Sequence, residues 1–439
     1  MDTLSKSIGA ILVLLSVCFF GLPAQAKYSG GTGEPNNPYQ IAKAEDLMLL
    51  GETPEDYDKH FILTADIDLD PNLPGRKVFD RAVIAPDVND TTYSSGISLF
   101  EGTPFTGIFD GNGHTIWSLV IDGNSFLGLW GVLGVGARVT GLSIANVNIS
   151  GSDDFIGGLI GSSNGEIDNC NVTGSVSGEL YVGGLAGRNS GDIFGSHCSG
   201  PITGKYWMGG LIGQNRDGDV TRCHSNVTVI GGSLIGGLIG DLWGATVAEC
   251  YSSGTVTGNW YVGGLVGSNS ATITQCWNSA AVTGRERVTG GLAGANDSYI
   301  YECYNTGAVG GNAIVGGLVG HNQYIHFGTQ ELTGVIAMSY SSGAVNGEWV
   351  VGGLVGSTAT SDWLYGGAIT TASFWDVETS GQNTSVGGTG KTTAEMQTAR
   401  LFLDAGWDFV DETDNGTEDI WWILEGQDYP RLWWEAHNN

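Results

Sequence analysis

The sequence is short of basic residues, of proline and of long apolar runs, and each shortage excludes a class of protein. Lys and Arg number 17 against 46 Asp and Glu, which gives a net charge of −29. We therefore expect no nucleic-acid partner, because phosphate binding needs clustered cations. The 73 glycines show no three-residue period and prolines number only 10, so collagen is excluded. No apolar run after residue 26 is long enough to predict a transmembrane segment in the mature chain.

The first 26 residues have the pattern of an export signal. Lys6 gives a weakly basic start, Ile8 to Leu22 is apolar, and Ala24-Gln25-Ala26 is a small-residue cleavage site. We expect a secreted or cell-surface protein whose mature chain begins at Lys27.

A repeat dominates the rest of the chain. A Gly-Gly pair recurs with its first glycine at positions 157, 183, 209, 236, 263, 290, 316 and 352, at steps of 26 or 27 residues and a final step of 36. Each pair opens a phrase such as GGLVGSNS, and a second phrase such as CYSSGTVTG follows most of them. No copy has room for a helix between its turns, so short strands and an all-β fold are expected.

The period favours a single parallel β-helix, with one coil of about 26 residues and three short strands per copy. A propeller fits poorly, because each of its blades needs about 40–50 residues. A solenoid has two open ends, so we also expect caps that contain short helices. Residues 43–50 suit a helix over the first coil. Thr393 suits the N-cap of a helix from Ala394 to about Asp404, with Gly406 after it and a Trp-rich plug over 407–434.

The phrases GGLxGxN and CYxxGxVxG resemble the GLUG-motif repeat proteins, which are secreted and surface proteins of bacteria and often adhesin-like. The resemblance implies residues 105–371 as β-helix repeats. It also implies residues 27–104 as an N-terminal cap with the first coils and long loops, and residues 372–439 as a C-terminal capping segment.

Six cysteines of the mature chain follow the repeat. We assign them to one repeat position and expect a ladder of buried thiols, since Ser339 stands at the same position in the last copy. Disulfides between neighbouring coils and a zinc site are the alternatives. The ladder residues are Cys170, Cys198, Cys223, Cys250, Cys276 and Cys303.

Six asparagines also follow the repeat. They follow the Gly pairs at what we take to be one position, with Asp241 and Thr358 there in two other copies. Stacked coils let amide side chains hydrogen-bond along a ladder, so we expect a structural role. The residues are Asn164, Asn189, Asn215, Asn269, Asn296 and Asn322.

The sequence offers one candidate metal site and no other cofactor site. Asp66, Asp68 and Asp70 alternate along one predicted strand, so their carboxylates could bind calcium. Solvated surface carboxylates are the alternative.

Aromatic residues provide the candidate binding surface. Tyr206, Trp260 and Trp349 all lie three residues before a Gly pair. If this column faces solvent, it can stack sugar rings; otherwise the rings cover the solenoid's own apolar surface. The insertions at 71–104 and 323–334 are further candidates, because loops on a rigid scaffold often carry recognition.

These features predict a monomeric, non-catalytic binding or adhesion-type protein whose partner is a glycan or a surface protein. No HExxH or P-loop motif occurs. The alternative is a β-helix hydrolase or lyase acting on polysaccharide, which would need carboxylates gathered in a cleft at an insertion. A structural envelope component is the third possibility.

Overall fold

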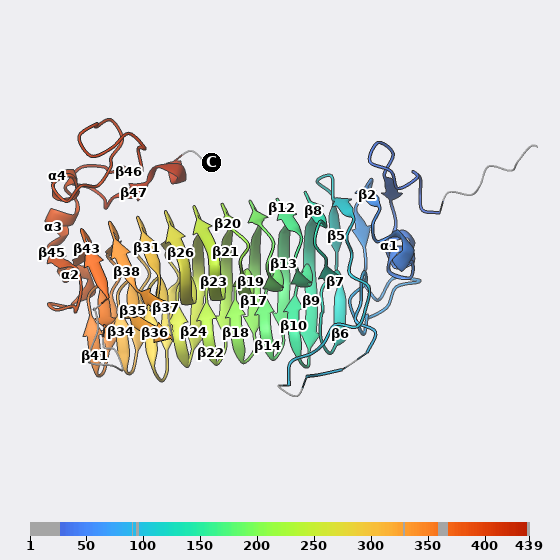
Figure 1. Cartoon of the computed structure of the whole chain (residues 1–439), viewed down its shortest axis with the longest axis horizontal. Coiled ribbons are helices and arrows are strands. Elements are labelled where there is room, and N and C mark those ends of the chain that lie inside the picture. The colour runs from blue at the N-terminus through green and yellow to red at the C-terminus, as the bar shows by residue number, and fades with distance from the viewer. Residues whose placement is uncertain (1–26, 90, 94–95, 328–329, 359–367, 437–439) are drawn as a thin grey trace, which may run out of the picture.

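The computed structural model describes residues 27–89, 91–93, 96–327, 330–358 and 368–436. Over these residues the chain forms a single right-to-left row of stacked parallel coils (Figure 1), which confirms the predicted all-β parallel β-helix. The central coils pair with the next at an offset of 26 or 27 residues, as in the pairs Gly183↔Gly209 and Gly236↔Gly263. The predicted signal segment 1–26 lies outside the described residues.

Three long sheets run along the solenoid in the described part of the chain. The first has 19 strands and forms two arrays that merge in β23 and β26. Its strands are β1 (Tyr39–Ile41), β2 (His60–Leu63), β4 (Ile108–Asp110), β7 (Trp130–Leu133), β8 (Arg138–Thr140), β11 (Ile160–Ser163), β12 (Glu166–Asp168), β15 (Ala186–Asn189), β16 (Ile193–Phe194), β19 (Ile212–Arg216), β20 (Val220–Thr221), β23 (Ile239–Ala248), β26 (Val266–Thr274), β30 (Ala293–Asn296), β31 (Tyr299–Tyr301), β35 (Val319–Asn322), β38 (Val335–Ala337), β42 (Val355–Ser357) and β43 (Ile369–Thr371).

The second sheet carries the Gly pairs and the third carries the cysteine phrases. The second has eight described strands: β10 (Asp154–Gly157), β14 (Leu180–Gly183), β18 (Tyr206–Gly209), β22 (Ser233–Gly236), β25 (Trp260–Gly263), β29 (Val288–Gly290), β34 (Ile314–Gly316) and β41 (Val350–Gly352). The third has 16 described strands: β3 (Ile67–Asp68), β5 (Thr115–Trp117), β6 (Val120–Gly123), β9 (Ser143–Gly151), β13 (Asn171–Ser177), β17 (His197–Thr203), β21 (His224–Ile230), β24 (Tyr251–Gly258), β27 (Trp277–Asn278), β28 (Ala281–Gly284), β32 (Tyr304–Asn305), β33 (Val309–Gly311), β39 (Tyr340–Ser341), β40 (Val345–Gly347), β44 (Phe374–Asp376) and β45 (Thr389–Lys391).

A coil has more strands than the three that the sequence predicts. The coil that begins with β14 contains β14, β15, β16 and β17. The additional strand arises because the first sheet bends between β15 and β16. Asn189 ends β15, and its side-chain amide donates to the main-chain oxygen of Gly191 beyond the bend. In β23 the two strands merge into one, and the corner is made within it by Gly244, which has a φ of 66°.

The core of the repeating coils is aliphatic and narrow, and the Gly pairs allow the close approach of backbone and core side chains. Val182, Leu185, Ile212 and their repeats in other coils are fully buried. A Cβ on Gly183 would lie 2.1 Å from the main-chain oxygen of Ala186, and one on Gly184 would lie 2.1 Å from the Sγ atom of Cys198. The pairs are therefore glycine because neighbouring backbone and core side chains approach too closely for any side chain.

The N-terminal end is covered as expected. Helix α1 (Ala44–Gly51) starts one residue after the predicted position and buries Ala44, Leu47 and Leu50 against the first coils, and η1 (Pro54–Asp56) follows it. The 71–104 insertion then runs beside the coils, with the parallel bridges Phe79↔Ile121 and Ile84↔Trp130.

The C-terminal cap differs from the predicted single helix. After α2 (Val377–Ser380), two short helices appear, α3 (Thr393–Met396) and α4 (Ala399–Leu403). The N-cap of α3 is Thr392 rather than Thr393, in a capping box with Glu395. The helix stops because Thr398 is extended (φ −122°, ψ 119°) and begins the next one, whose first N–H is accepted by Glu425.

The Trp-rich segment builds a second apolar cluster around Phe402, Trp407 and Trp421, all fully buried. It includes the antiparallel pair β46 (Trp421–Trp422) and β47 (Arg431–Leu432) and ends in η2 (Trp433–Ala436). Figure 1 shows this segment turning back over one side of the last coils instead of only closing their end. The 323–334 insertion forms an antiparallel hairpin of β36 (Tyr324–Phe327) and β37 (Gln330–Thr333).

Candidate functional site

The cysteines at the corner before the third sheet form a ladder of hydrogen-bonded free thiols. The Sγ atom of Cys276 accepts from the backbone N–H of Cys250 at 3.3 Å and donates to the carbonyl of Thr274 at 3.1 Å. Cys250 and Cys223 repeat this pattern. Burial raises the pKa of Cys170 to about 12 and that of Cys276 well above its ordinary value, so these thiols are not nucleophiles.

The prediction that all six cysteines share one position is wrong for Cys198. It pairs with Val172 and with Ser225, two residues further along the coil than the ladder. Ser196 holds the ladder position instead: its Oγ accepts from the N–H of Cys170, and its own N–H donates to Cys223 Sγ. The thiol of Cys198 is buried and donates to the carbonyl of Gly210 at 2.9 Å. All six cysteines are free.

The asparagines at the bend of the first sheet form hydrogen bonds with one another along the solenoid axis. Amide-to-amide hydrogen bonds of 2.7 Å join Asn189 to Asn215, Asn269 to Asn296 and Asn296 to Asn322. All five side chains are fully buried. Each ladder amide also bonds to main-chain atoms just beyond its own corner, so these residues hold the turns and the stacking together.

Two assignments to this ladder are wrong. Ser163, not Asn164, pairs with Asn189, because the first copy has Ser-Ser before its asparagine. Leu242, not Asp241, pairs with both Asn215 and Asn269, so an apolar side chain divides the ladder into two segments. A second amide ladder, from Asn278 to Asn305 at 2.8 Å, lies in the column of Cys198, and the sequence reasoning missed it.

The carboxylates proposed for calcium do not converge. Asp66 accepts from the ring of His114 and from the backbone N–H of Thr115, while Asp68 and Asp70 each accept from a backbone N–H two residues further on. Asp66 therefore bonds to residues of another coil, whereas Asp68 and Asp70 close local turns. Within the described ranges, no group of three or more His, Cys, Asp or Glu side chains is placed to hold a metal ion.

Two columns of rings in the described coils stack along the axis. One stack joins Phe126, Phe155, Tyr181 and Trp207, with centroid distances of 4.8 to 5.0 Å. Phe155, Tyr181 and Trp207 each stand one residue after a member of the predicted column. This recurrence of aromatic residues in successive copies could have revealed the stack from the sequence. All four residues of the stack have positive φ (52°, 61°, 51° and 54°), which is unfavourable for bulky side chains. Ring stacking at coil spacing helps to offset that strain.

A second stack follows the thiol ladder by one residue. It is formed by His197, His224, Tyr251, Trp277, Tyr304 and Tyr340. Such stacks use ring faces internally, so they leave mainly ring edges for a ligand.

The predicted aromatic column is exposed and unstacked. Tyr206, Ser233 and Trp260 pair in register on β18, β22 and β25. Tyr206 is 44% exposed, Trp260 40% and Trp349 81%. The guanidinium of Arg287 lies 4.6 Å from the Trp260 ring centre, and the indole N–H donates to Glu286. Since Arg287 belongs to the next coil, the other face of Trp260 is turned toward Ser233 and, beyond it, Tyr206.

The same column begins beneath the 71–104 insertion with a buried carboxyl group. Asp154 pairs with Leu180, which pairs with Tyr206. Its Oδ2 accepts from the N–H of Ser98 at 2.8 Å, while its Oδ1 has no partner. Burial, together with a smaller effect of the adjacent Asp153, raises the pKa of Asp154 to about 7.

Two adjoining cavities lie beside Asp154, and they share Asp87, Asn124 and Ser125. One has a volume of about 220 Å³ and also includes Ser98 and Asp153; the other has about 230 Å³ and also includes Asp122. The carboxylates expected of an enzyme are thus gathered at this insertion.

Comparison with known proteins gives partial likenesses only. The chain is 32% identical over 160 residues to halomucin of Haloquadratum walsbyi, which is 36% of this chain and 2% of that protein. It is 33% identical over 159 residues to the "Putative Gly-rich membrane protein" of Evansella cellulosilytica, which is 33% of this chain and 15% of that protein. The chain therefore matches only a small part of each relative's length.

Among solved structures, the chain is similar to the Bacteroides ovatus protein titled "putative immunoglobulin A1 protease". The identity is 19%, with 93% of this chain and 96% of that one covered, and the TM-score is 0.39. No family model matches the sequence. Across the described segments, no helix has the length and apolar character needed to cross a membrane.

Proposed function

We propose that this chain is a secreted or surface-displayed repeat protein that binds a glycan through the column of Tyr206, Trp260 and Trp349. The carrying observation is that these rings stay exposed and unstacked, whereas the neighbouring ring columns are used up in internal stacks. Partial similarity to halomucin and to a protein named as a membrane protein supports display at or beyond the cell surface. The export signal, the likeness to GLUG-motif proteins and a monomeric state belong to the same proposal.

The spacing of the rings suits a sugar. Tyr206 and Trp260 are separated by one strand that carries the small residue Ser233, so the rings are about 10 Å apart at ~4.8 Å per strand. Carbon atoms in contact lie about 3.5–4.0 Å apart. A sugar ring can therefore sit over Ser233 with an aromatic ring on each side. Arg287 and Glu286 beside Trp260 supply hydrogen-bonding groups for its hydroxyls.

A glycan array probed with the mature chain tests the proposal. We expect Trp260→Ala to weaken binding to the recognised glycan about tenfold, the equivalent of ~1.4 kcal/mol. Tyr299→Ala is the matched control, because Tyr299 is 45% exposed on the first sheet, outside the column. Equal affinities of the two variants would remove the column from the binding surface.

A polysaccharide hydrolase or lyase is the second candidate, favoured by the carboxylates under the insertion. Asp154, whose pKa is raised, and its neighbour Asp153 provide a proton donor and an anionic partner in one place. They lie at the start of the column that carries Tyr206, where Asp153 lines the cavity of about 220 Å³ and Asp154 is fully buried behind it. Release of reducing ends by the wild type, lost in Asp154→Asn, would show catalysis and overturn the purely binding function.

A further inference from the structure

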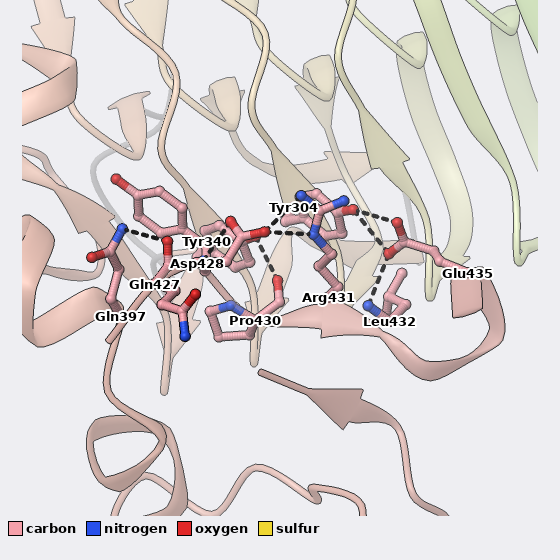
Figure 2. A network of polar contacts seen from close by, with 10 residues as sticks. Tyr304, Tyr340, Gln397, Gln427, Asp428, Pro430, Arg431, Leu432 and Glu435 are labelled. Atoms are coloured by element: carbon pink, nitrogen blue, oxygen red, sulfur yellow. Dashed lines mark hydrogen bonds and ion pairs between the residues drawn. The ribbon is translucent and has the colours of Figure 1, made fainter. Parts of the chain in front are cut away.

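The C-terminal segment 428–435 lies along the outer ring stack of the last coils (Figure 2). The hydroxyl of Tyr304 donates to Glu435 at 2.9 Å, and that of Tyr340 donates to the carbonyl of Pro430 at 2.7 Å. The indole N–H of Trp434 donates to the carbonyl of Gln275 at 3.0 Å. These contacts join residues 90 to 159 positions apart in sequence, so the segment is held at a fixed height above the stack.

The segment does not close completely on the stack. A cavity of about 250 Å³ remains between the rings of Trp277, Tyr304 and Tyr340 on one side and Asp428, Arg431 and Glu435 on the other. Pockets for drug-sized ligands span roughly 300–1,000 Å³. The space therefore suits a single six-membered ring with its substituents.

The stack itself is widened at this place. Ring centres are 4.4 Å apart between Tyr251 and Trp277 and 5.0 Å apart between Tyr304 and Tyr340, but 6.0 Å apart between Trp277 and Tyr304. Trp277 also has an indole N–H that is buried without an acceptor.

The polar groups of the cavity match several hydroxyls at once. Arg431 is a donor paired with the Asp428 carboxylate at 2.7 Å, and Glu435 is an acceptor that already holds Tyr304. Ser279 and Thr306 add exposed hydroxyls at the rim. Donors and acceptors alternating around aromatic edges are what a polyhydroxylated ring requires. Two carboxylates against one guanidinium disfavour an anionic ligand.

We infer that this cavity binds one neutral sugar residue, at a site separate from the exposed column. The inference rests on the proposed function only in taking the ligand to be a glycan; the cavity uses none of the column's residues. The C-terminal segment is then part of a binding site as well as a cap.

The test is a titration of the mature chain, followed by NMR, with methyl glucoside, methyl galactoside, N-acetylglucosamine and glucuronate. We expect at least one neutral sugar to bind with a millimolar Kd and glucuronate to bind at least tenfold more weakly. Thr306→Trp places a bulky ring at the exposed rim and should reduce neutral-sugar binding at least tenfold. Thr228→Trp, at an equally exposed strand position of β21, is the matched control and should leave it unchanged.

Absence of binding by every neutral sugar would overturn the inference, as would equal binding by the two Trp variants or tighter binding of glucuronate. Circular dichroism of both variants establishes that the solenoid is intact. Failure here is distinguishable from failure of the proposed function, because that function is tested by Trp260→Ala on the glycan array. If Trp260→Ala loses binding on the array and Thr306→Trp has no effect, the exposed column remains a binding site and the cavity does not.

Discussion

At the scale of single residues, the thiol and hydroxyl groups of the corner ladder are chemically equivalent. Cys250, Cys276 and Ser339 all accept an N–H from the previous coil, and each donates to the carbonyl two residues before it. The ladder therefore selects a small side chain that is both donor and acceptor, which explains why both cysteine and serine occur there.

This equivalence predicts the effect of two substitutions at one position. Cys276→Ser should lower the free energy of unfolding by less than ~1 kcal/mol, because it keeps both hydrogen bonds. Cys276→Ala should lower it by about 1–3 kcal/mol, because the buried N–H of Cys250 loses its acceptor. Urea denaturation of the three proteins measures the difference. Equal losses would mean that packing, not hydrogen bonding, determines the choice of residue.

The buried carboxyl of Asp154 predicts a pH dependence of stability. Its pKa is about 7 in the folded chain and about 3.9 when unfolded, so the folded state holds more protons between these values. Stability should therefore fall as pH rises from about 4 to 7 and then level off. Asp154→Asn keeps an acceptor for Ser98 but has no charge to bury.

Thermal unfolding of both proteins from pH 4 to pH 8 checks this. The variant should be the more stable one at pH 8, and the difference should shrink toward zero near pH 4. A constant stability difference across the range would show that Asp154 is already ionised in the folded chain at low pH.

At the scale of elements, the repeating phrases were enough to predict the coil but not which side chains share a column. Alignment on the Gly pair placed the exposed column correctly, since the pair and the column lie on the same short strand. Assignment by residue type failed for Asn164 and Cys198, because Ser163 and Ser196 occupy the ladder positions in those copies. Corners, unlike strands, have no fixed spacing in sequence.

The C-terminal helices show the same limit. The start and stop signals Thr393 and Gly406 favoured one helix from Ala394 to about Asp404, but Thr398 interrupts it by bonding to the carbonyl of Ala394 and leaving the helical conformation. The carboxylate of Glu425 then caps the second helix. That cap comes from 26 residues away in the chain, so local sequence could not reveal it. The cavity beside segment 428–435 depends on equally distant contacts.

At the scale of the whole molecule, stability in a solenoid is divided among neighbouring coils. Segment 428–435 contacts the coils that contain β27, β32 and β39, through Gln275, Tyr304 and Tyr340. Its influence should be confined to that end of the molecule.

Termination of the chain after Gln427 tests this. Backbone amides of β32 and β39 should exchange with deuterium faster than in the full chain, while those of β13 and β17 should not change. Hydrogen exchange followed by mass spectrometry resolves the two regions. A uniform increase along all coils would show that the solenoid unfolds as one cooperative unit.

The regular offset between coils also has a genetic consequence. An in-frame duplication or loss of about 80 bases, anywhere between two equivalent corners, adds or removes one whole coil and moves the two caps about 4.8 Å apart or together. The 36-residue step shows that even an uneven insertion is absorbed, because its surplus forms the β36–β37 hairpin on the outside. Recombination between such repeated gene segments can therefore change the distance between the two ends of the solenoid while leaving the fold and both caps intact.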